Sequence, residues 1–349
     1  MTRNKIWDTI PVEIQDPFYQ KDPDNGRIVS WTEATREALS FALAGDPSVF
    51  IMGEGVDDPY AMFGTTKDLH KEFGSDRVFD TPLAETGITG IAVGAAQAGM
   101  HPLYFHNRPD FLYLALDQLA NHAAKWAYMF AGQVPIPLVI WSCIGRGWAG
   151  SGAQHSQALQ GLFTHIPGLK VVMPASCFDV KGLMLAAIKD RNPVVIIDHR
   201  YNFKMRGHVP EEAYIVPLGK GVIRRTGKDV TIVATSHLVF DAWQAAEELA
   251  NKGIDAELID PRTLKPLDEE LILQSIEKTG RLVVVDTGWK SAGFAAEVAA
   301  LAAEKAFSAL KAPIRRVTAP DAPTLAGSTL EEGYYVGKKE ILAAVQSIV

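Results

Sequence analysis

Short apolar runs that alternate with helical patterns are the feature that most constrains the fold of this chain. The intervening segments space their apolar residues as amphipathic helices do, and we expect among them a long helix at 111–130 and another that starts near Gln154. Strands that are apolar throughout and separated by helices form parallel sheets covered on both faces. The pattern therefore predicts an α/β protein of two doubly wound domains. The expected strands lie at 48–53, 77–79, 101–105, 137–141, 170–173, 194–198, 229–235, 255–260, 281–286 and 314–317.

A break in composition divides these strands into two groups. The segment 203–226 is charged, contains Pro210 and Pro217, and has few periodic apolar positions, which is typical of a connection between domains. A length of 349 residues also suits two domains. We therefore expect four segments: an N-terminal arm at 1–27, a first domain at 28–205, a linker at 206–226 and a second, association domain at 227–349.

Composition excludes several classes of protein. A net charge of −7 and a pI near 5.7 argue against a nucleic-acid-binding surface. The N-terminus lacks the apolar core of a signal peptide, and no apolar run is long enough to span a membrane. Cys143 and Cys177 are far apart and have no metal-binding spacing. We expect a reduced, cytoplasmic protein that binds neither nucleic acid nor membrane.

Residues 80–99 predict a helix of unusual composition, with Glu85 at its start and Gly87, Gly90 and Gly94 within it. Each glycine inside a helix costs about 1 kcal/mol relative to alanine. We therefore expect this helix to pack very closely against a neighbouring element or a flat ligand. A carboxylate at a helix N-terminus is ordinarily a capping or dipole-matched group, which is the alternative role for Glu85.

The expected ligand site lies in the first domain. In open α/β sheets, ligands bind beyond the carboxyl ends of the strands. The loops there that carry polar or glycine-rich sequence lie around Glu85 and at 106–111, 142–155 and 199–203. The second domain offers no motif of comparable chemistry, so we expect it to serve subunit association.

Four motifs together carry a family resemblance: Glu85-Thr-Gly-Ile-Thr-Gly-Ile-Ala-Val-Gly, and the segments 116–125, 153–157 and 167–174. In order and spacing they resemble the beta subunits of thiamine-diphosphate-dependent 2-oxo-acid dehydrogenases of the pyruvate, branched-chain and acetoin types. The second half resembles the transketolase C-terminal domain. The resemblance runs from about residue 30 to the end. The motifs of the second half are at 234–238, 260–266 and 284–288.

This resemblance implies roles for four residues of the first domain. Glu85 matches the family glutamate that hydrogen-bonds a pyrimidine nitrogen of thiamine diphosphate and passes a proton to that ring. Phe111 matches the aromatic residue that stacks on the pyrimidine, and Asn107 belongs to the same cofactor-binding loop. His155 matches a histidine that donates a proton or hydrogen bond near the reacting carbon. The alternatives are a core side chain for Phe111 and a helix cap for His155.

Two further sets of residues complete the expected site. His106 and Arg108 stand where a carboxylate or phosphate of the substrate would be met, and a surface loop is the alternative for Arg108. The family usually has an arginine after the strand that ends at Trp141, and its absence here points to a larger or more polar substrate. A set of backbone carbonyls and one carboxylate resembles the site of a structural potassium ion in these subunits. The residues of that site are Leu138, Ala187, Asp190 and Asn192.

The sequence has no Gly-Asp-Gly followed by a distant Asn, the motif by which this superfamily anchors magnesium and the diphosphate. The resemblance therefore implies an alpha subunit that supplies that half of the site in an α₂β₂ assembly. The implied reaction is oxidative decarboxylation of a 2-oxo acid, with acyl transfer to a lipoyl acyltransferase. Two alternatives stay open: the C-terminal subunit of a split transketolase or related thiamine-dependent lyase, and a non-catalytic assembly subunit with a vestigial site.

Overall fold

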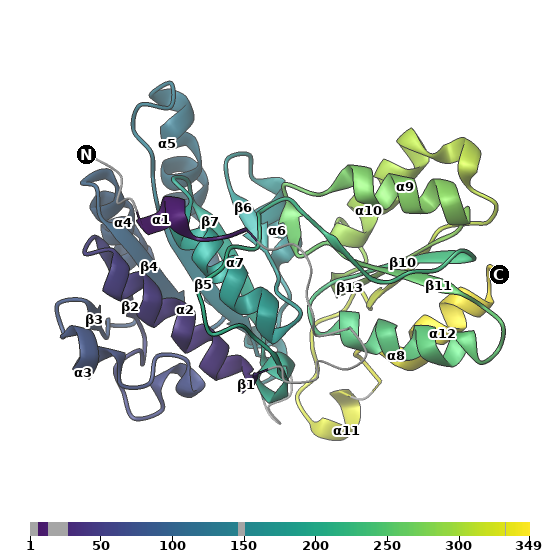
Figure 1. The fold of residues 1–349 in the computed structure, drawn as a ribbon, viewed down its shortest axis with the longest axis horizontal. Helices are drawn as coiled ribbons and strands as arrows, with labels where there is room; N and C mark the ends of the chain where they lie inside the picture. The colour runs from purple at the N-terminus through teal and green to yellow at the C-terminus, as the bar shows by residue number, and fades with distance from the viewer. Residues whose placement is uncertain (1–5, 13–26, 146–150, 332) are drawn as a thin grey trace.

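The computed structural model describes residues 6–12, 27–145, 151–331 and 333–349. It contains two large sheets, each covered by helices on both faces (Figure 1). The first sheet has the order β12-β6-β7-β5-β4-β2-β3, and all its pairs are parallel except β12 with β6. Its strands are β2 (Val49–Gly53), β3 (Val78–Phe79), β4 (His101–His106), β5 (Val139–Ile144), β6 (Lys170–Val172), β7 (Val194–His199) and β12 (Thr263–Lys265).

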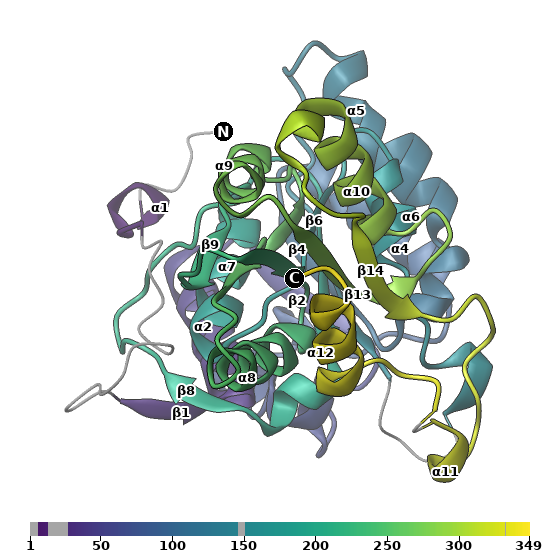
Figure 2. The same cartoon turned by 90° about the vertical axis from the view of Figure 1, so that its right-hand side faces the viewer.

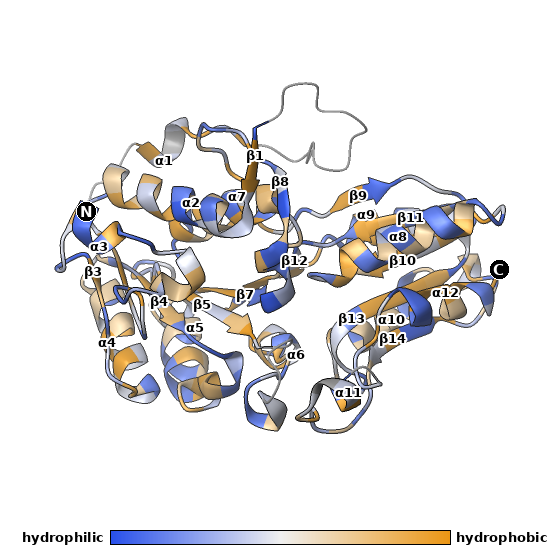
Figure 3. Ribbon diagram, turned by 90° about the horizontal axis from the view of Figure 1, so that it is seen from below, coloured by the Kyte–Doolittle hydropathy of each residue, from blue (hydrophilic) through white to orange (hydrophobic). Residues whose placement is uncertain are grey.

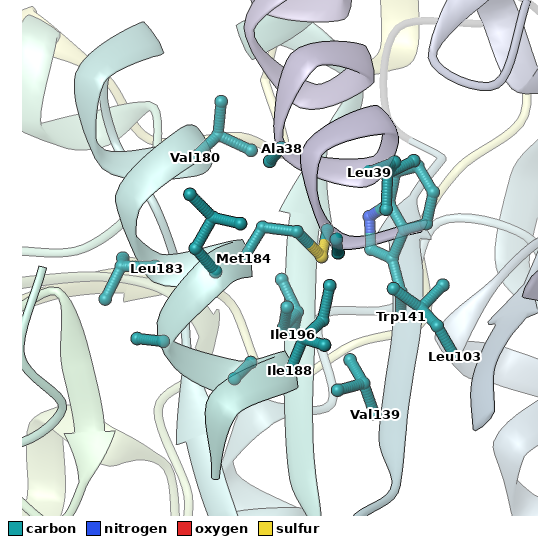
Figure 4. Close-up of a cluster of buried hydrophobic side chains, with 14 of the residues drawn as sticks. Ala38, Leu39, Leu103, Val139, Trp141, Val180, Leu183, Met184, Ile188 and Ile196 are labelled. Atoms are coloured by element: carbon teal, nitrogen blue, oxygen red, sulfur yellow. The ribbon is translucent and has the colours of Figure 1, made fainter. Parts of the chain in front are cut away.

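Two sets of helices enclose the first sheet. The helices α2 (Trp31–Gly45) and α7 (Cys177–Lys189) pack with the strands into one buried cluster. Figure 4 shows Met184 of α7 and Leu39 of α2 meeting above strand residues such as Trp141. A second cluster contains residues of α4 (Glu85–Gln97), η4 (Gln118–Ala123) and α6 (Gln160–His165). Ser30 caps α2, and its side chain and that of Glu33 form a capping box.

The second sheet has the order β14-β13-β10-β11-β9 and is parallel except for the pairing of β9 with β11. Figure 2 shows α8 and α12 on one side of this sheet and α9 and α10 on the other. Its strands are β9 (Val222–Arg225), β10 (Val230–Ala234), β11 (Ala256–Asp260), β13 (Leu282–Trp289) and β14 (Arg315–Ala319). Its helices are α8 (Leu238–Ala250), α9 (Glu269–Thr279), α10 (Phe294–Lys305) and α12 (Lys338–Gln346).

One hydrophobic core runs through both domains. Phe163 of α6 belongs to the same buried cluster as Ile259 of β11 and Phe294 of α10. Figure 3 shows the hydrophobic colour gathered on strands such as β7 and β13, between helices with hydrophilic outer faces. The two sheets therefore share buried apolar surface, which favours a fixed arrangement of the domains.

The smaller elements lie mostly in the connections between strands. No helix among the described residues has the length and hydrophobicity to cross a membrane. The remaining elements are α1 (Ile6–Thr9), β1 (Ile28–Ser30), η2 (Ala61–Gly64), α3 (Leu69–Phe73), η3 (Pro109–Tyr113), α5 (Ala124–Met129), η5 (Gly152–Gln154), η6 (Arg200–Lys204), β8 (Arg206–His208), η7 (Phe307–Ala309) and α11 (Ser328–Glu331).

The segment 206–226, expected as a linker, contributes strands to two sheets. Its first strand, β8, pairs with β1, and its last strand, β9, pairs with β11 in the second sheet. In the other direction, β12 leaves the second half of the chain and pairs with β6 at the edge of the first sheet. The polar composition of 206–226 belongs to edge strands and turns. It therefore did not indicate an unstructured linker.

A buried ionic cluster joins the interleaved segments. Asp179 of α7 is fully buried and contacts Arg224 of β9 and Arg262, whose Nε lies 2.8 Å from Asp179 Oδ1. Arg224 also donates to Asp260 Oδ2 (2.7 Å). Two guanidinium groups and two carboxylates thus neutralise each other out of contact with water. Removing one partner from such a cluster leaves an uncompensated buried charge.

Two helix predictions need correction. The single helix expected at 111–130 is three pieces, η3, a π-helical turn at η4 and α5. A π-helical turn inserts one extra residue and changes the direction of the side chains that follow. The helix expected near Gln154 begins only at Gln160, because 155–159 form neither helix nor strand after η5.

Of the N-terminal arm, Trp7 is buried and donates to Asp46 Oδ2 (2.8 Å), and residues 1–5 and 13–26 lie outside the described chain.

Candidate active site

The carboxyl edge of the first sheet brings the predicted residues together. Glu85 is the first residue of α4 and follows β3 within a few residues. The N-cap position before it is Ala84, whose side chain makes no capping hydrogen bond, and Glu85 is only 8% exposed. The position therefore differs from that of an ordinary N-terminal cap, which uses the preceding residue and bonds backbone N–H groups.

A second carboxylate, Glu54, lies beside Glu85 and was missed in the sequence. Burial raises the pKa of Glu54, the carboxylates of Glu85 and Asp80 raise it further, and a hydrogen bond from Asn107 opposes them. A carboxyl group with a raised pKa beside a second carboxylate is suited to holding and releasing a proton. The available signal was the pair Gly53-Glu54, directly after a buried strand next to the one that leads to Glu85.

Phe111 and His155 meet at the same edge. Their rings contact edge to face, with centroids 5.2 Å apart and planes at 80°. Asp110, which precedes Phe111, accepts hydrogen bonds from the backbone N–H (3.1 Å) and Nε2 (2.7 Å) of Gln157. Burial raises the pKa of Asp110, and these bonds oppose the rise. The loop after β4 and the loop after β5 are thereby tied together, with an aromatic ring and an imidazole side by side.

A direct contact links this pair to the start of α4. The hydroxyl of Thr86 donates to the carbonyl oxygen of Leu114 (2.5 Å), just after η3. The structure thus connects Glu85, Phe111 and His155 through adjacent segments. Asn107 belongs to the same edge, because its side chain reaches Glu54.

His106 and Arg108 occupy different surroundings from those expected of substrate-binding groups. His106 is 2% exposed, its Nε2 lies 3.3 Å from Thr89 Oγ1, and burial lowers its pKa to about 3. Arg108 is 4% exposed, donates to the carbonyl oxygen of Asn107 (2.6 Å) and lies 5.8 Å from the ring centroid of Phe63. Both side chains are packed inside the protein, so neither presents a surface to a substrate in this structure.

The residues expected to bind potassium come together near the amino ends of the strands. Asp190 contacts the Lys170 ammonium group through one carboxylate oxygen and accepts from the backbone N–H of Asn192 (2.9 Å) through the other. The carbonyl of Leu138 accepts from Val194, and that of Ala187 accepts from Asp190. A potassium ion at Asp190 would therefore compete with the lysine ammonium group.

The exposed face of α4 is apolar and nearly without side chains. A Cβ atom added to Gly87 or Gly94 would meet nothing within 4 Å, so at these two positions the described residues do not provide the close packing expected of this helix. Leu83, two residues before Glu85, is 79% exposed. Leu114, whose carbonyl accepts from Thr86, is 57% exposed, and Ile91 of α4 is also exposed. An apolar surface of this kind is typical of a contact with another molecule.

Comparison with known proteins assigns each half of the chain to a known domain family. The transketolase pyrimidine-binding domain family matches residues 27–205, and the transketolase C-terminal domain family matches residues 219–341. A solved structure titled split gene transketolase, inactive beta4 tetramer, has the same fold. It superposes with a TM-score of 0.73 at 24% sequence identity and covers 92% of this chain and 98% of that one.

Sequence relatives narrow the family further. The beta subunit of acetoin:2,6-dichlorophenolindophenol oxidoreductase from Bacillus subtilis is 41% identical, over 93% of this chain and 98% of that subunit. The mitochondrial pyruvate dehydrogenase E1 component subunit beta from Dictyostelium discoideum is 41% identical, over 93% and 94% of the two chains. This chain belongs to the family of beta subunits of thiamine-diphosphate-dependent 2-oxo-acid dehydrogenases, which are oxidoreductases that work with an alpha subunit.

Proposed function

We propose that this chain supplies the pyrimidine half of a thiamine diphosphate site in an α₂β₂ 2-oxo-acid dehydrogenase. The alpha subunit supplies the magnesium and diphosphate half, for which this sequence has no motif. The observation that supports the proposal most is the gathering of Glu85, Phe111 and His155 at one carboxyl edge.

The residues present fit the pyrimidine ring of the cofactor. Phe111 is partly buried and offers an aromatic ring beside the carboxylate-bearing start of α4. The open space over Gly87 allows a ligand or a partner to approach the helix backbone closely. The exposed apolar residues Leu83 and Leu114 fit burial by the alpha subunit at the rim of the site.

Thiamine diphosphate, when bound, supplies the electron sink for decarboxylation of a 2-oxo acid. Glu85 holds a proton at its carboxylate and exchanges it with a pyrimidine nitrogen. Glu54, whose pKa is raised by burial and by the neighbouring Glu85, favours retention of a proton between the two groups. Phe111 orients the ring by contact with its face. His155 donates a proton or hydrogen bond to the reacting group or to the acyl acceptor.

The names of the relatives guide the choice of substrate and acceptor. We infer a 2-oxo acid or acetoin as substrate and a lipoyl acyltransferase as acceptor. The alternative of a split transketolase has less support, since the resemblance to that structure is 24% in sequence against 41% for the acetoin and pyruvate enzymes. A potassium ion at Leu138, Ala187, Asp190 and Asn192 stays a prediction.

Reconstitution of the complex tests the proposal. We expect the chain and its alpha subunit, with magnesium and thiamine diphosphate, to reduce 2,6-dichlorophenolindophenol with pyruvate, 2-oxoisovalerate or acetoin as donor. Glu85→Gln should lower this activity about 10²- to 10⁴-fold, whereas Glu304→Gln on the exposed surface of α10 should not. Full activity of Glu85→Gln would favour an assembly subunit, and ketol transfer without decarboxylation would favour the transketolase alternative.

A further inference from the structure

The loop that carries His155 is held by two glutamine side chains. Residues 155–159 form no helix or strand, so backbone hydrogen bonds of regular structure do not fix their position. Gln157 bonds Asp110, next to Phe111, through its backbone N–H and its side chain. Gln160, at the start of α6, bonds the second domain. His155 lies two residues before the first anchor, so its position depends on how firmly these two glutamines hold the loop.

The second anchor ends on a buried carboxylate of β13. Gln160 Nε2 donates to Asp286 Oδ1 (2.7 Å) and to Thr287 Oγ1 (3.0 Å). The hydroxyl of Thr235, at the end of β10, donates to the same Asp286 oxygen (3.0 Å). Gln160 and Asp286 are fully buried. Burial of a hydrogen-bonded carboxylate makes its position strongly preferred, since any loosened arrangement leaves polar groups without partners.

This contact is not needed to hold the domains together. The ionic cluster of Asp179, Arg224 and Arg262 and the insertion of β12 into the first sheet already do so. The loop itself, however, has space to move. A cavity of about 140 Å³ lies between the domains, lined by Gln160, Asp286 and neighbours in both domains. If the Gln160 bond were lost, the segment behind His155 would have room to shift into it.

We propose that Gln160 and Asp286 are positioning residues for His155, so that the second domain contributes to the geometry of the active site. The inference rests on the proposed catalytic role of His155. Its physical content is that catalysis requires the imidazole at a fixed distance from the reacting carbon, and a displacement of about 1 Å can lower a rate about 100-fold.

The first experiment uses the full chain without cofactor or alpha subunit. Gln160→Met keeps the length of the side chain but removes both hydrogen bonds. His155 itself is exposed, so the measurement is made on the loop backbone. We expect the amide of Gln157, which is bonded to Asp110, to exchange with deuterium about threefold faster or more in this variant, because the loop is less protected, while the amides of α12 exchange at an unchanged rate. The matched control is Lys265→Met, which removes another bond between the domains, from Lys265 Nζ to the Thr164 carbonyl (2.9 Å). An unchanged exchange rate at Gln157, or an equal rise in the control, would overturn the inference.

The second experiment uses the reconstituted holoenzyme. Gln160→Met should lower kcat about 10- to 100-fold and leave KM and the affinity for thiamine diphosphate within about threefold. Lys265→Met should change neither. If Gln160→Met fails to fold, Thr287→Val removes one acceptor of the Gln160 amide and should lower kcat less, in the same pattern. A loss confined to KM overturns the inference. An inactive wild-type complex would instead count against the proposed function. The result of the first experiment, on the chain alone, would then decide the inference.

Discussion

Asp198 gives the most quantitative test of the structure. It is the fifth residue of β7, fully buried, and accepts one hydrogen bond from Trp141 Nε1 (2.8 Å) at Oδ2. Its Oδ1 has no hydrogen-bond partner in the described part of the chain. Burial raises its pKa from the ordinary 3.8 to about 7, against the opposing effects of the indole N–H groups of Trp141 and Trp31. The carboxyl group is therefore protonated in the folded protein at pH 5 and ionised in the unfolded chain.

The sign of the pH effect follows from this difference. Between pH 4 and 7 the folded state binds one more proton than the unfolded state, so the free energy of unfolding falls as the pH rises. The shift of about 3 units corresponds to a total of about 4 kcal/mol, of which about 2–3 kcal/mol falls between pH 5 and pH 8. Asp198→Asn retains an acceptor for Trp141 and cannot ionise. We therefore expect the free energy of unfolding of the variant, relative to that of the wild type, to rise by about 2–3 kcal/mol from pH 5 to pH 8.

Urea unfolding of the chain at pH 5, 6, 7 and 8 measures this gain. Asp76→Asn, at an exposed position, serves as the control and should follow the wild-type pH dependence. Comparison of variants removes the contributions of all other titrating groups. If Asp198→Asn and the wild type lost stability in parallel from pH 5 to pH 8, the account of Asp198 as a buried, neutralised carboxyl group would be wrong.

Three further predictions address the domain junction, the core and the partner surface. Asp179→Asn should lower the free energy of unfolding by about 3–5 kcal/mol, because two buried guanidinium groups then share one carboxylate, and urea titration measures this. His106→Gln should gain about 3 kcal/mol in free energy of unfolding relative to the wild type between pH 7 and pH 4, because burial lowers the pKa of His106 to about 3 and protonation of this histidine in the unfolded chain favours unfolding of the wild type alone. Parallel pH dependences of the two proteins in urea titrations would contradict this. Gly94→Leu should leave the chain folded yet prevent elution with the alpha subunit in gel filtration; normal assembly would exclude this face of α4 from the interface.

Much of the site could be predicted from local sequence because the strands of the first sheet are mostly parallel. In a parallel sheet the residues after each strand meet at one edge, whatever the strand order. Glu85, Phe111 and His155 could therefore be assigned to one region from their motifs alone. Glu54 follows β2 and could be placed at the same edge, but its position beside Glu85 depends on β2 and β3 being neighbours, which Gly53-Glu54 does not reveal. The burial of His106 and Arg108 was likewise not evident in the sequence, because the side to which a residue points depends on where the strand ends.

The sequence by itself determined the class of fold and the candidate residues for catalysis, because periodicity and side-chain type are properties of short segments. The tertiary structure alone decided how the halves interleave. The insertion of β12 beside β6, the Asp179 cluster and the bond from Gln160 to Asp286 join residues 45 to 126 positions apart. Such contacts depend on which strands become neighbours and on how much water is excluded between them. These are consequences of packing the whole chain, and no single segment carries their signal.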